Sequence, residues 1–194
     1  MKQIIARILL LMLLMPVPVF AHQWTLDPDH SEINFRIQHI YSKITGRFPG
    51  VDADVFFNPE NLGASRFNFT VAVDSVDTRN QKRDTHLRSP DFFDSARFPV
   101  MRFTSSKVSL VQDNTYSLEG EITIKNVTKP LAITFVYHGE KENPMNKAEM
   151  VAGFDAEFSL NRLDYAVGYG KFFFMGAIGN QVDITISLEM KRRP

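Results

Sequence analysis

The stretch EINFRIQHI, residues 32–40, decides the fold class of this chain. Its first seven residues alternate between polar and apolar side chains, so Ile33, Phe35 and Ile37 share one face. A period of two is typical of a β-strand that buries one face and exposes the other, whereas a helix would repeat every three to four residues. The stretch therefore predicts a half-buried strand.

The same alternation recurs along most of the chain. It is found in VDADVFF (51–57), RFNFTVAV (66–73), YSLEGEITIK (116–125), LAITFVYH (131–138), AGFDAEFSL (152–160) and VDITISLEM (182–190). Turn-forming stretches such as NPENLG (58–63), QDNT (112–115) and HGEKENPMN (138–146) separate these segments. Many short strands joined by turns predict an all-β protein, built as an antiparallel sandwich or barrel. Without repeats or linkers, one domain is expected.

The first 21 residues are predicted to be a secretory signal peptide. Lys2 and Arg7 precede the apolar run ILLLMLLM (8–15), which is too short to span a bilayer. A small residue, Ala21, follows at a position suited to cleavage. The mature domain is therefore expected to comprise residues 22–194 and to be exported to the periplasm.

Composition excludes several classes of function. The chain has no cysteine, which excludes a disulfide framework, a thiolate nucleophile and a metal site with cysteine ligands. Its 22 basic residues equal its 22 acidic residues, and no basic stripe suggests a nucleic-acid partner. A secreted protein without disulfides must be held together by its core, which suits a bacterial periplasm.

Residues 75–99 form the longest part of the chain without strand alternation. SVDTRNQKRDTHL (75–87) predicts a helix that is polar nearly all round, with Asp77 or Thr78 as its N-cap. Ser89 and Pro90 then predict the start of a single helical turn that presents Phe92 and Phe93. This short helical lid could plug the open end of a barrel, or the two rings could fill a corner of a packed sandwich.

Two further clusters each allow two interpretations. The charges of residues 79–91 predict either a helix with local ion pairs or a polar rim that meets a ligand headgroup; the rim residues would be Arg79, Arg83 and His86. The aromatic run KFFFM, residues 171–175, could line a rim or form a fully buried strand. We expect burial for the second cluster.

Catalytic and metal-binding motifs are not predicted. Asp27, His30 and Ser31 lie close in the sequence, but a G-x-S-x-G turn is lacking, and DPDHS (27–31) more simply predicts a turn. The five histidines show no H-E-x-x-H or H-x-H spacing. We therefore expect no catalytic centre, no metal site and no cofactor.

Five stretches, in order, resemble the YceI-like family of periplasmic polyisoprenoid-binding proteins. They are WTLDPDHSEINFRIQHI, ITGRFPGVDADVFFNPEN, SVDTRNQKRDTHLRSPDFFDSARFPVMRFTS, YSLEGEITIKNVTKPLAITF and SLNRLDYAVG, and they span nearly the whole mature chain. The resemblance implies an antiparallel, eight-stranded, lipocalin-like barrel with an elongated apolar cavity. It also implies that a long isoprenoid or quinone-type lipid occupies that cavity, and it carries over no catalytic residues.

The apolar faces of the predicted strands, together with the lid, supply the expected ligand cavity. Its predicted residues are Phe35, Ile37, Phe69, Phe92, Phe93, Phe103, Ile124, Phe135, Phe154 and Phe158. So many phenylalanine, isoleucine and valine side chains offer more apolar surface than a solid core of this size requires. The expected partner is a polyisoprenoid or another long-chain amphiphilic lipid; a homodimer and a transient membrane contact are both compatible with the sequence.

Three functions follow from these patterns. The first is a periplasmic binding protein that stores or transports the lipid. The second is a lipid-modifying enzyme on the same barrel that acts through His86 or His30. The third is a structural or stress-related protein whose own side chains fill the barrel. We expect the first, and we expect the protein not to be an enzyme.

Export gives the first prediction. Expressed in a bacterium with a periplasm, the protein should be recovered from the periplasmic fraction with His22 as its first residue, because cleavage after Ala21 removes the apolar run. N-terminal sequencing and intact mass measure this directly. Cytoplasmic protein that retains Met1 would contradict the prediction.

Overall fold

The computed structural model describes residues 23–193, so the predicted signal peptide lies outside the described residues. Ten strands account for most of this part of the chain: β1 (Gln23–Leu26), β2 (Glu32–His39), β3 (Ser42–Arg47), β4 (Val51–Phe56), β5 (Arg66–Ala72), β6 (Val100–Gln112), β7 (Thr115–Ile124), β8 (Val127–Asn143), β9 (Asn146–Asn161) and β10 (Ile178–Arg192). The helices are short: α1 (Gln81–Arg88), α2 (Lys171–Phe174), and the 3-10 turns η1 (Leu62–Ala64), η2 (Val73–Ser75) and η3 (Arg162–Tyr165). Between residues 23 and 193, no helix is long and apolar enough to cross a membrane.

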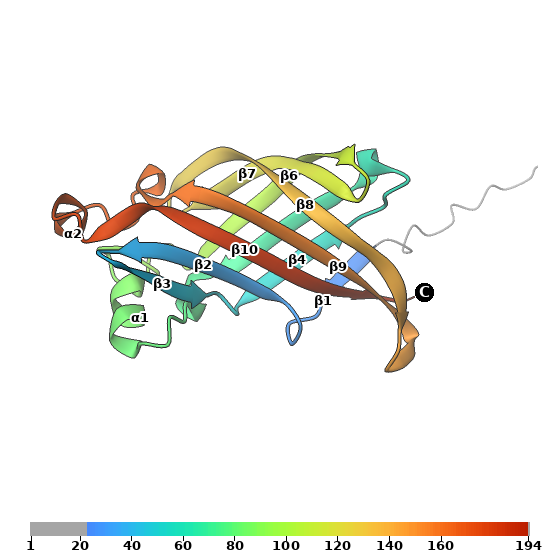
Figure 1. Ribbon diagram of the computed structural model, residues 1–194, viewed down its shortest axis with the longest axis horizontal. Coiled ribbons are helices and arrows are strands. Elements are labelled where there is room, and N and C mark those ends of the chain that lie inside the picture. The colour runs from blue at the N-terminus through green and yellow to red at the C-terminus, as the bar shows by residue number, and fades with distance from the viewer. Residues whose placement is uncertain (1–22, 194) are drawn as a thin grey trace, which may run out of the picture.

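Eight strands form a closed ring. The sheet runs β1-β4-β5-β6-β7-β8-β9-β10, and β10 pairs again with β1. Every pairing in the ring is antiparallel (Figure 1). The predicted all-β, antiparallel, eight-stranded barrel is thus confirmed, and the stretch that predicted it forms β2.

The ring closes at one end only. The last residues of β10 pair with β1 through Thr25↔Lys191 and Leu26↔Met190. The rest of the same edge pairs with β2, from Ser187↔Glu32 to Ile178↔His39. The β2–β3 hairpin therefore extends the sheet beyond the ring, and β3 is the end of the strand order. At this open end, an isolated bridge between Arg47 and Asp77 joins β3 to the segment that follows β5.

Residues 73–99, which we call the lid, fill the space beside β3. The side chain of Asn80 caps the lid helix α1 by accepting a hydrogen bond from the backbone N–H of Arg83. The predicted caps were wrong, because the Asp77 carboxylate accepts from the backbone N–H of Arg79 and the Thr78 hydroxyl bonds Asp84. Ser89 ends α1, and its hydroxyl donates to the His86 carbonyl. Its own carbonyl accepts from the backbone N–H of Phe92 at 3.0 Å, so the single turn predicted after Ser89 is present at residues 90–93.

Aromatic side chains fill the closed end of the barrel. The ring of Phe57 lies 5.0–5.8 Å, between centroids, from the rings of Phe67, Tyr116, Phe135, Tyr137 and Phe154. Trp24, Val55 and Met190 are fully buried in the same cluster. Edge-to-face aromatic pairs add about 0.5–1.5 kcal/mol each beyond the burial of their surface. This end of the barrel is therefore a solid core.

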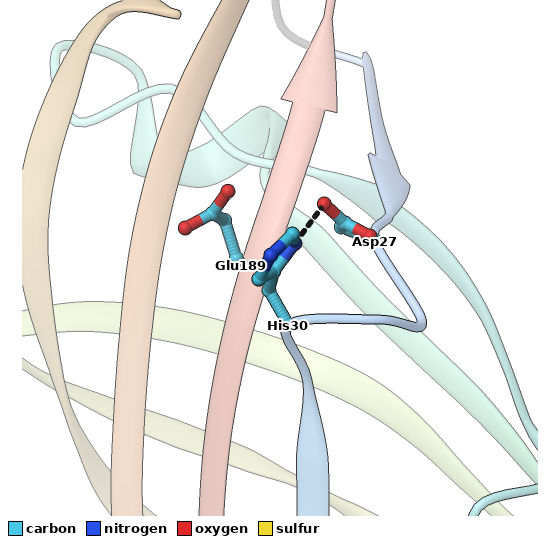
Figure 2. Close-up of side chains that lie close together, drawn as sticks. All are labelled: Asp27, His30 and Glu189. Atoms are coloured by element: carbon cyan, nitrogen blue, oxygen red, sulfur yellow. Dashed lines mark hydrogen bonds and ion pairs between the residues drawn. The ribbon is translucent and has the colours of Figure 1, made fainter. Parts of the chain in front are cut away.

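A buried carboxylate joins the turn between β1 and β2, residues 27–31, to strand β10; we call this turn and its contacts with β10 the seam. Asp27, only 2% exposed, accepts hydrogen bonds from the Lys191 ammonium at 2.6 Å, the His30 Nδ1 at 2.8 Å and the backbone N–H of Asp29 at 3.1 Å. The predicted turn is thus confirmed. Figure 2 shows His30 pointing toward Asp27, with Glu189 on the neighbouring strand. Ligand atoms of Asp27, His30 and Glu189 lie within 4.8 Å of one another, but the Lys191 ammonium already supplies a cation to Asp27, so we interpret the cluster as an ion-pair network.

The seam makes stability depend on pH in two directions. Burial raises the pKa of Asp27, but hydrogen bonds from Lys191 and His30 outweigh it and lower that pKa from 3.8 to about 2. The Asp27 hydrogen bond raises the pKa of His30 above 6.5. Because the carboxyl pKa is lowered, its contribution is present above pH 3.8 and is lost as the pH falls towards 2. The histidine contribution is present below pH 6.5 and is lost as the pH rises through the raised pKa.

Asp27→Asn tests the seam. It should lower the free energy of unfolding by about 1–3 kcal/mol, because it removes the charge that Lys191 and His30 contact. It should also flatten both limbs of the pH dependence. Urea unfolding followed between pH 2 and 9 measures both effects.

Asp29→Asn is the matched control, since Asp29 is exposed on the same turn. Equal urea midpoints for the two variants would show that Asp27 does not fasten the seam.

Candidate functional site

A cavity of about 650 Å³ lies inside the barrel, between the aromatic cluster and the lid. Both Ile178 and Leu188 of β10 line it, and these residues are ten positions apart on one strand. At roughly 3.3 Å per residue, the cavity extends for about 30 Å along the barrel. It is therefore long and narrow.

Strand alternation builds its wall. Ile33, Phe35 and Ile37 project inward from β2. Their antiparallel partners on β10 are, respectively, Ile186, Ile184 and Val182. The same two-residue spacing brings Leu131, Ile133 and Phe135 inward from β8 and Ala156, Phe158 and Leu160 from β9. The result is an almost wholly apolar wall, which excludes water and favours an apolar ligand.

The structure places all ten residues of the predicted cavity on this wall. They are Phe35, Ile37, Phe69, Phe92, Phe93, Phe103, Ile124, Phe135, Phe154 and Phe158. Phe135 and Phe154 also belong to the aromatic cluster and form the floor of the cavity at the closed end. That these side chains contact a ligand stays a prediction.

Phe92 and Phe93 of the lid lie over the open end of the cavity. Phe92 is buried beside Ile124, Tyr165 and Val167, and its ring centroid is 4.9 Å from that of His86. Phe93 is half-buried and meets the ring of Phe48 edge-on at 5.8 Å. Both rings line the cavity, so they close an open barrel rather than fill a corner of a sandwich.

The three predicted rim residues divide into two groups. Arg83 and His86 border the cavity. The Arg83 guanidinium donates to the Thr78 hydroxyl at 2.7 Å and to the Thr78 carbonyl at 2.9 Å, while the His86 Nε2 lies 3.2 Å from Asp91. Arg79 differs from the expectation: it does not line the cavity, because its side chain turns to the Thr45 hydroxyl on β3 at 3.2 Å.

Sequence reasoning missed a buried cation on the cavity wall. Arg162, 6% exposed, donates to the carbonyls of Val167, Gly168, Gly179 and Ile178 at 2.6–3.3 Å. Burial lowers its pKa, and no carboxylate in residues 23–193 forms an ion pair with it. Its burial depends on residues 162–168 folding back across the barrel end, and no local pattern indicates that path.

The prediction of a buried strand at residues 171–175 was wrong. Lys171–Phe174 is the short helix α2, and Phe174 and Met175 are 70% and 74% exposed. Gly176, at φ +66°, ends this turn, and β10 begins only at Ile178. Because the barrel closes through other strands, this stretch has no partner strand and its aromatic rings pack on one another: the Phe174 centroid lies 5.6 Å from that of Tyr169 and 5.5 Å from that of Phe173.

The two candidates for histidine catalysis lie in different parts of the barrel. His30 lies at the seam, outside the cavity, and the neighbouring Ser31 hydroxyl bonds the backbone of Glu189 rather than the imidazole. His86 lines the cavity and contacts the Asp91 carboxylate and the Phe92 ring. A Ser-His-Asp relay requires the hydroxyl within hydrogen-bond reach of the imidazole. His30 does not meet this requirement, because the Ser31 hydroxyl bonds the backbone of Glu189.

Comparison with known proteins agrees with this geometry. A family model described as a YceI-like domain matches residues 24–190. Protein YceI of Escherichia coli is 35% identical over 172 residues, which cover 87% of this chain and 86% of the relative. The UPF0312 protein VVA0736 of Vibrio vulnificus is 34% identical over 169 residues, which cover 86% of this chain and 88% of the relative.

Solved structures share the barrel. The crystal structure of Burkholderia cenocepacia BcnA has a TM-score of 0.76 at 22% identity, and the match covers 84% of this chain and 98% of that one. A polyisoprenoid binding domain from Saccharophagus degradans, implicated in plant cell wall breakdown, has a TM-score of 0.67 at 14% identity and covers 89% and 99%. At these identities, the likeness shows the fold.

Gly168 tests how the lid is seated. A Cβ there would lie 2.6 Å from the Phe92 ring and 2.7 Å from Arg162 Nη1, and its φ is +68°. Gly168→Ala should therefore lower the free energy of unfolding by about 1–3 kcal/mol, through overpacking and backbone strain. Urea unfolding measures the change.

Gly170→Ala is the control, because nothing lies within 4 Å of its added Cβ. A Gly168→Ala variant as stable as Gly170→Ala would show that Phe92 is not held in this position.

Proposed function

This chain belongs to the YceI-like family, and we propose that it is a binding protein that stores or transports a long isoprenoid or quinone-type lipid in its barrel. One observation carries the proposal: the barrel holds an elongated, apolar cavity of about 650 Å³ that its own side chains leave open. Pockets for small ligands have volumes of about 300–1,000 Å³. The polyisoprenoid binding domain of similar fold supports a lipid as the occupant.

The shape of the cavity favours a long chain. Each buried CH₂ group is worth about 0.8 kcal/mol, whereas association costs roughly 4–15 kcal/mol before the chain is ordered. A short acyl group barely offsets that cost. A cavity about 30 Å long accepts a chain with many more buried carbons, which gives useful affinity without a charged anchor.

The polar part of the wall favours a polar or anionic headgroup at the lid. Three of the lining residues are basic and face the cavity or its open end: Lys82, Arg83 and Arg162. Arg102 and Asp155 also border the cavity, but strand alternation turns both outward, where Asp155 pairs with His138 at 2.7 Å. Arg83 and His86 belong to the lid helix α1, and we propose that they form the headgroup rim, with Arg79 placed behind them against β3.

The two alternative functions have less support. A structural protein with a self-filled core would not need the open cavity beyond the aromatic cluster. A lipid-modifying enzyme would need a nucleophile or a general base aimed at the ligand, and the His30 candidate lies outside the cavity. We therefore propose binding, not turnover.

We also propose that the protein works in the periplasm. The predicted signal peptide supports export, and a cysteine-free domain with a large aromatic core folds without oxidation. An isoprenoid chain is nearly insoluble in water, so an enclosed carrier suits an aqueous compartment between membranes.

Ile184→Trp tests the cavity as the lipid site. Ile184 is half-buried on the inward face of β10, so the larger indole should fill part of the cavity and displace most of the bound lipid. Native mass spectrometry of protein purified from cells gives the ratio of lipid to protein, and circular dichroism confirms that the variant is folded.

Thr185→Trp places the same side chain on the exposed face of the same strand and should keep the wild-type ratio. A folded Ile184→Trp variant with undiminished lipid would show that the ligand lies elsewhere. Wild-type protein that neither contains lipid nor takes up a polyprenyl alcohol or ubiquinone from micelles would contradict the proposed function.

A further inference from the structure

Exposed apolar side chains gather at the open end of the barrel. Nine large apolar side chains are exposed among those that the structure describes, and five of them lie on two segments at this end; we call these five the lip: Ile40, Tyr41, Tyr169, Phe174 and Met175. Tyr41 is 98% exposed. Leaving such side chains in water is unfavourable, so contiguous patches of this kind mark surfaces that meet another apolar phase.

The two segments of the lip are held side by side. Ile40, in the β2–β3 turn, donates its backbone N–H to the Ala177 carbonyl at 3.0 Å, directly after the α2 turn. His39 pairs with Ile178 one step further along. Figure 1 shows α2 next to the adjoining ends of β2 and β10, at the end of the molecule where α1 also lies.

The lip continues the cavity wall outward. His39 and Ile178 line the cavity; His39 directly precedes Ile40, and Ile178 lies three residues after Met175. A lipid that enters or leaves at this end passes from the apolar wall directly onto the lip. Because an isoprenoid chain is poorly soluble in water, an apolar path that touches its source avoids exposing the chain.

The chemistry of the lip fits the surface of a bilayer. Tyrosine partitions into the headgroup region, where its apolar ring and its polar hydroxyl are both satisfied, and phenylalanine inserts at the boundary between headgroups and acyl chains. Lys43, in the β2–β3 hairpin, and Lys82, at the start of α1, are exposed at the same end and form no ion pair within the described part of the chain. Ammonium groups beside inserted aromatic rings favour anionic phospholipids.

We propose that the lip docks the open end of the barrel on an anionic membrane surface, where the ligand exchanges between bilayer and cavity. Ile40, Tyr41, Tyr169, Phe174 and Met175 insert among the headgroups, and Lys43 and Lys82 contact lipid phosphates. The role in exchange rests on the proposed lipid-binding function, whereas the docking itself does not require a lipid in the cavity.

The test is flotation of the mature protein with vesicles of phosphatidylglycerol or of phosphatidylcholine. Wild-type protein should float with the first and bind the second more weakly. Phe174→Ser with Met175→Ser should reduce binding to phosphatidylglycerol about tenfold, because two apolar anchors are lost. Lys43→Ser with Lys82→Ser should reduce it about fivefold for each charge and remove its dependence on salt.

The opposite end of the barrel supplies a matched control. Val111, near the end of β6, and Met145, in the β8–β9 turn, are exposed there, and neither lines the cavity. Val111→Ser with Met145→Ser should float like wild type. The proposal would be overturned if the Val111/Met145 variant lost as much vesicle binding as the Phe174/Met175 variant, or if wild-type protein did not bind vesicles. So would a dimer in sedimentation that dissociates in the Phe174/Met175 variant while vesicle binding is absent.

Loading from detergent micelles separates this proposal from the proposed function. The variant with Phe174→Ser and Met175→Ser should take up lipid from micelles as wild type does, because neither residue lines the cavity. Vesicle binding through the lip by a protein whose cavity takes up no lipid would leave docking standing and reject the carrier function. Normal uptake of lipid from micelles without lip-dependent vesicle binding would reject docking and leave the carrier function standing.

Discussion

One shared strand edge determines the rest of this structure. The edge of β10 pairs with β1 for two residues and with β2 for the remainder, so the chain closes the ring at one end and leaves it open at the other. Backbone groups on both stretches are satisfied, as a buried sheet edge requires. The buried Asp27 carboxylate sits where the chain changes from β1 to β2 and pairs with Lys191 of β10, so the change of partner is itself fixed by charge.

Because the ring closes at one end only, apolar side chains form a solid core at the closed end and line a cavity at the open end. At the closed end, inward side chains from both sides meet, and the rings around Phe57 pack to the density of a core. At the open end, β10 pairs with the β2–β3 hairpin instead of closing the ring, and apolar side chains line a cavity there. The aromatic rings gather at the closed end, whereas isoleucine and leucine side chains form much of the cavity wall.

The sequence was sufficient for what depends on local periodicity. Alternation predicted the strands and, through the inward faces of residues such as Phe35 and Phe69, the residues that line the cavity. The sequence was insufficient where contacts between distant parts of the chain determine the position of a side chain. The N-cap shifted to Asn80 because Asp77 and Thr78 found partners elsewhere, and Arg79 turned to Thr45 on a strand 34 residues away. The burial of Arg162 and the exposure of Phe174 both depend on how the chain crosses the barrel end, which no local pattern encodes.

The lid explains why a polar helix belongs over an apolar cavity. Its hydrogen bonds are mostly internal: Arg83 bonds Thr78, and Arg88 donates to the carbonyls of Asp74 and Val76. Polar links to the barrel are few, such as the Arg47–Asp77 pair at 3.1 Å. The lid is attached to the barrel mainly through apolar side chains: Val73 and Val76 are fully buried, and Phe92 and Phe93 line the cavity. The rings of Phe92 and Phe93 cover part of the cavity wall that a lipid would also cover. When a ligand passes beneath the lid, contacts between these rings and the wall are replaced by contacts between the lipid and the wall.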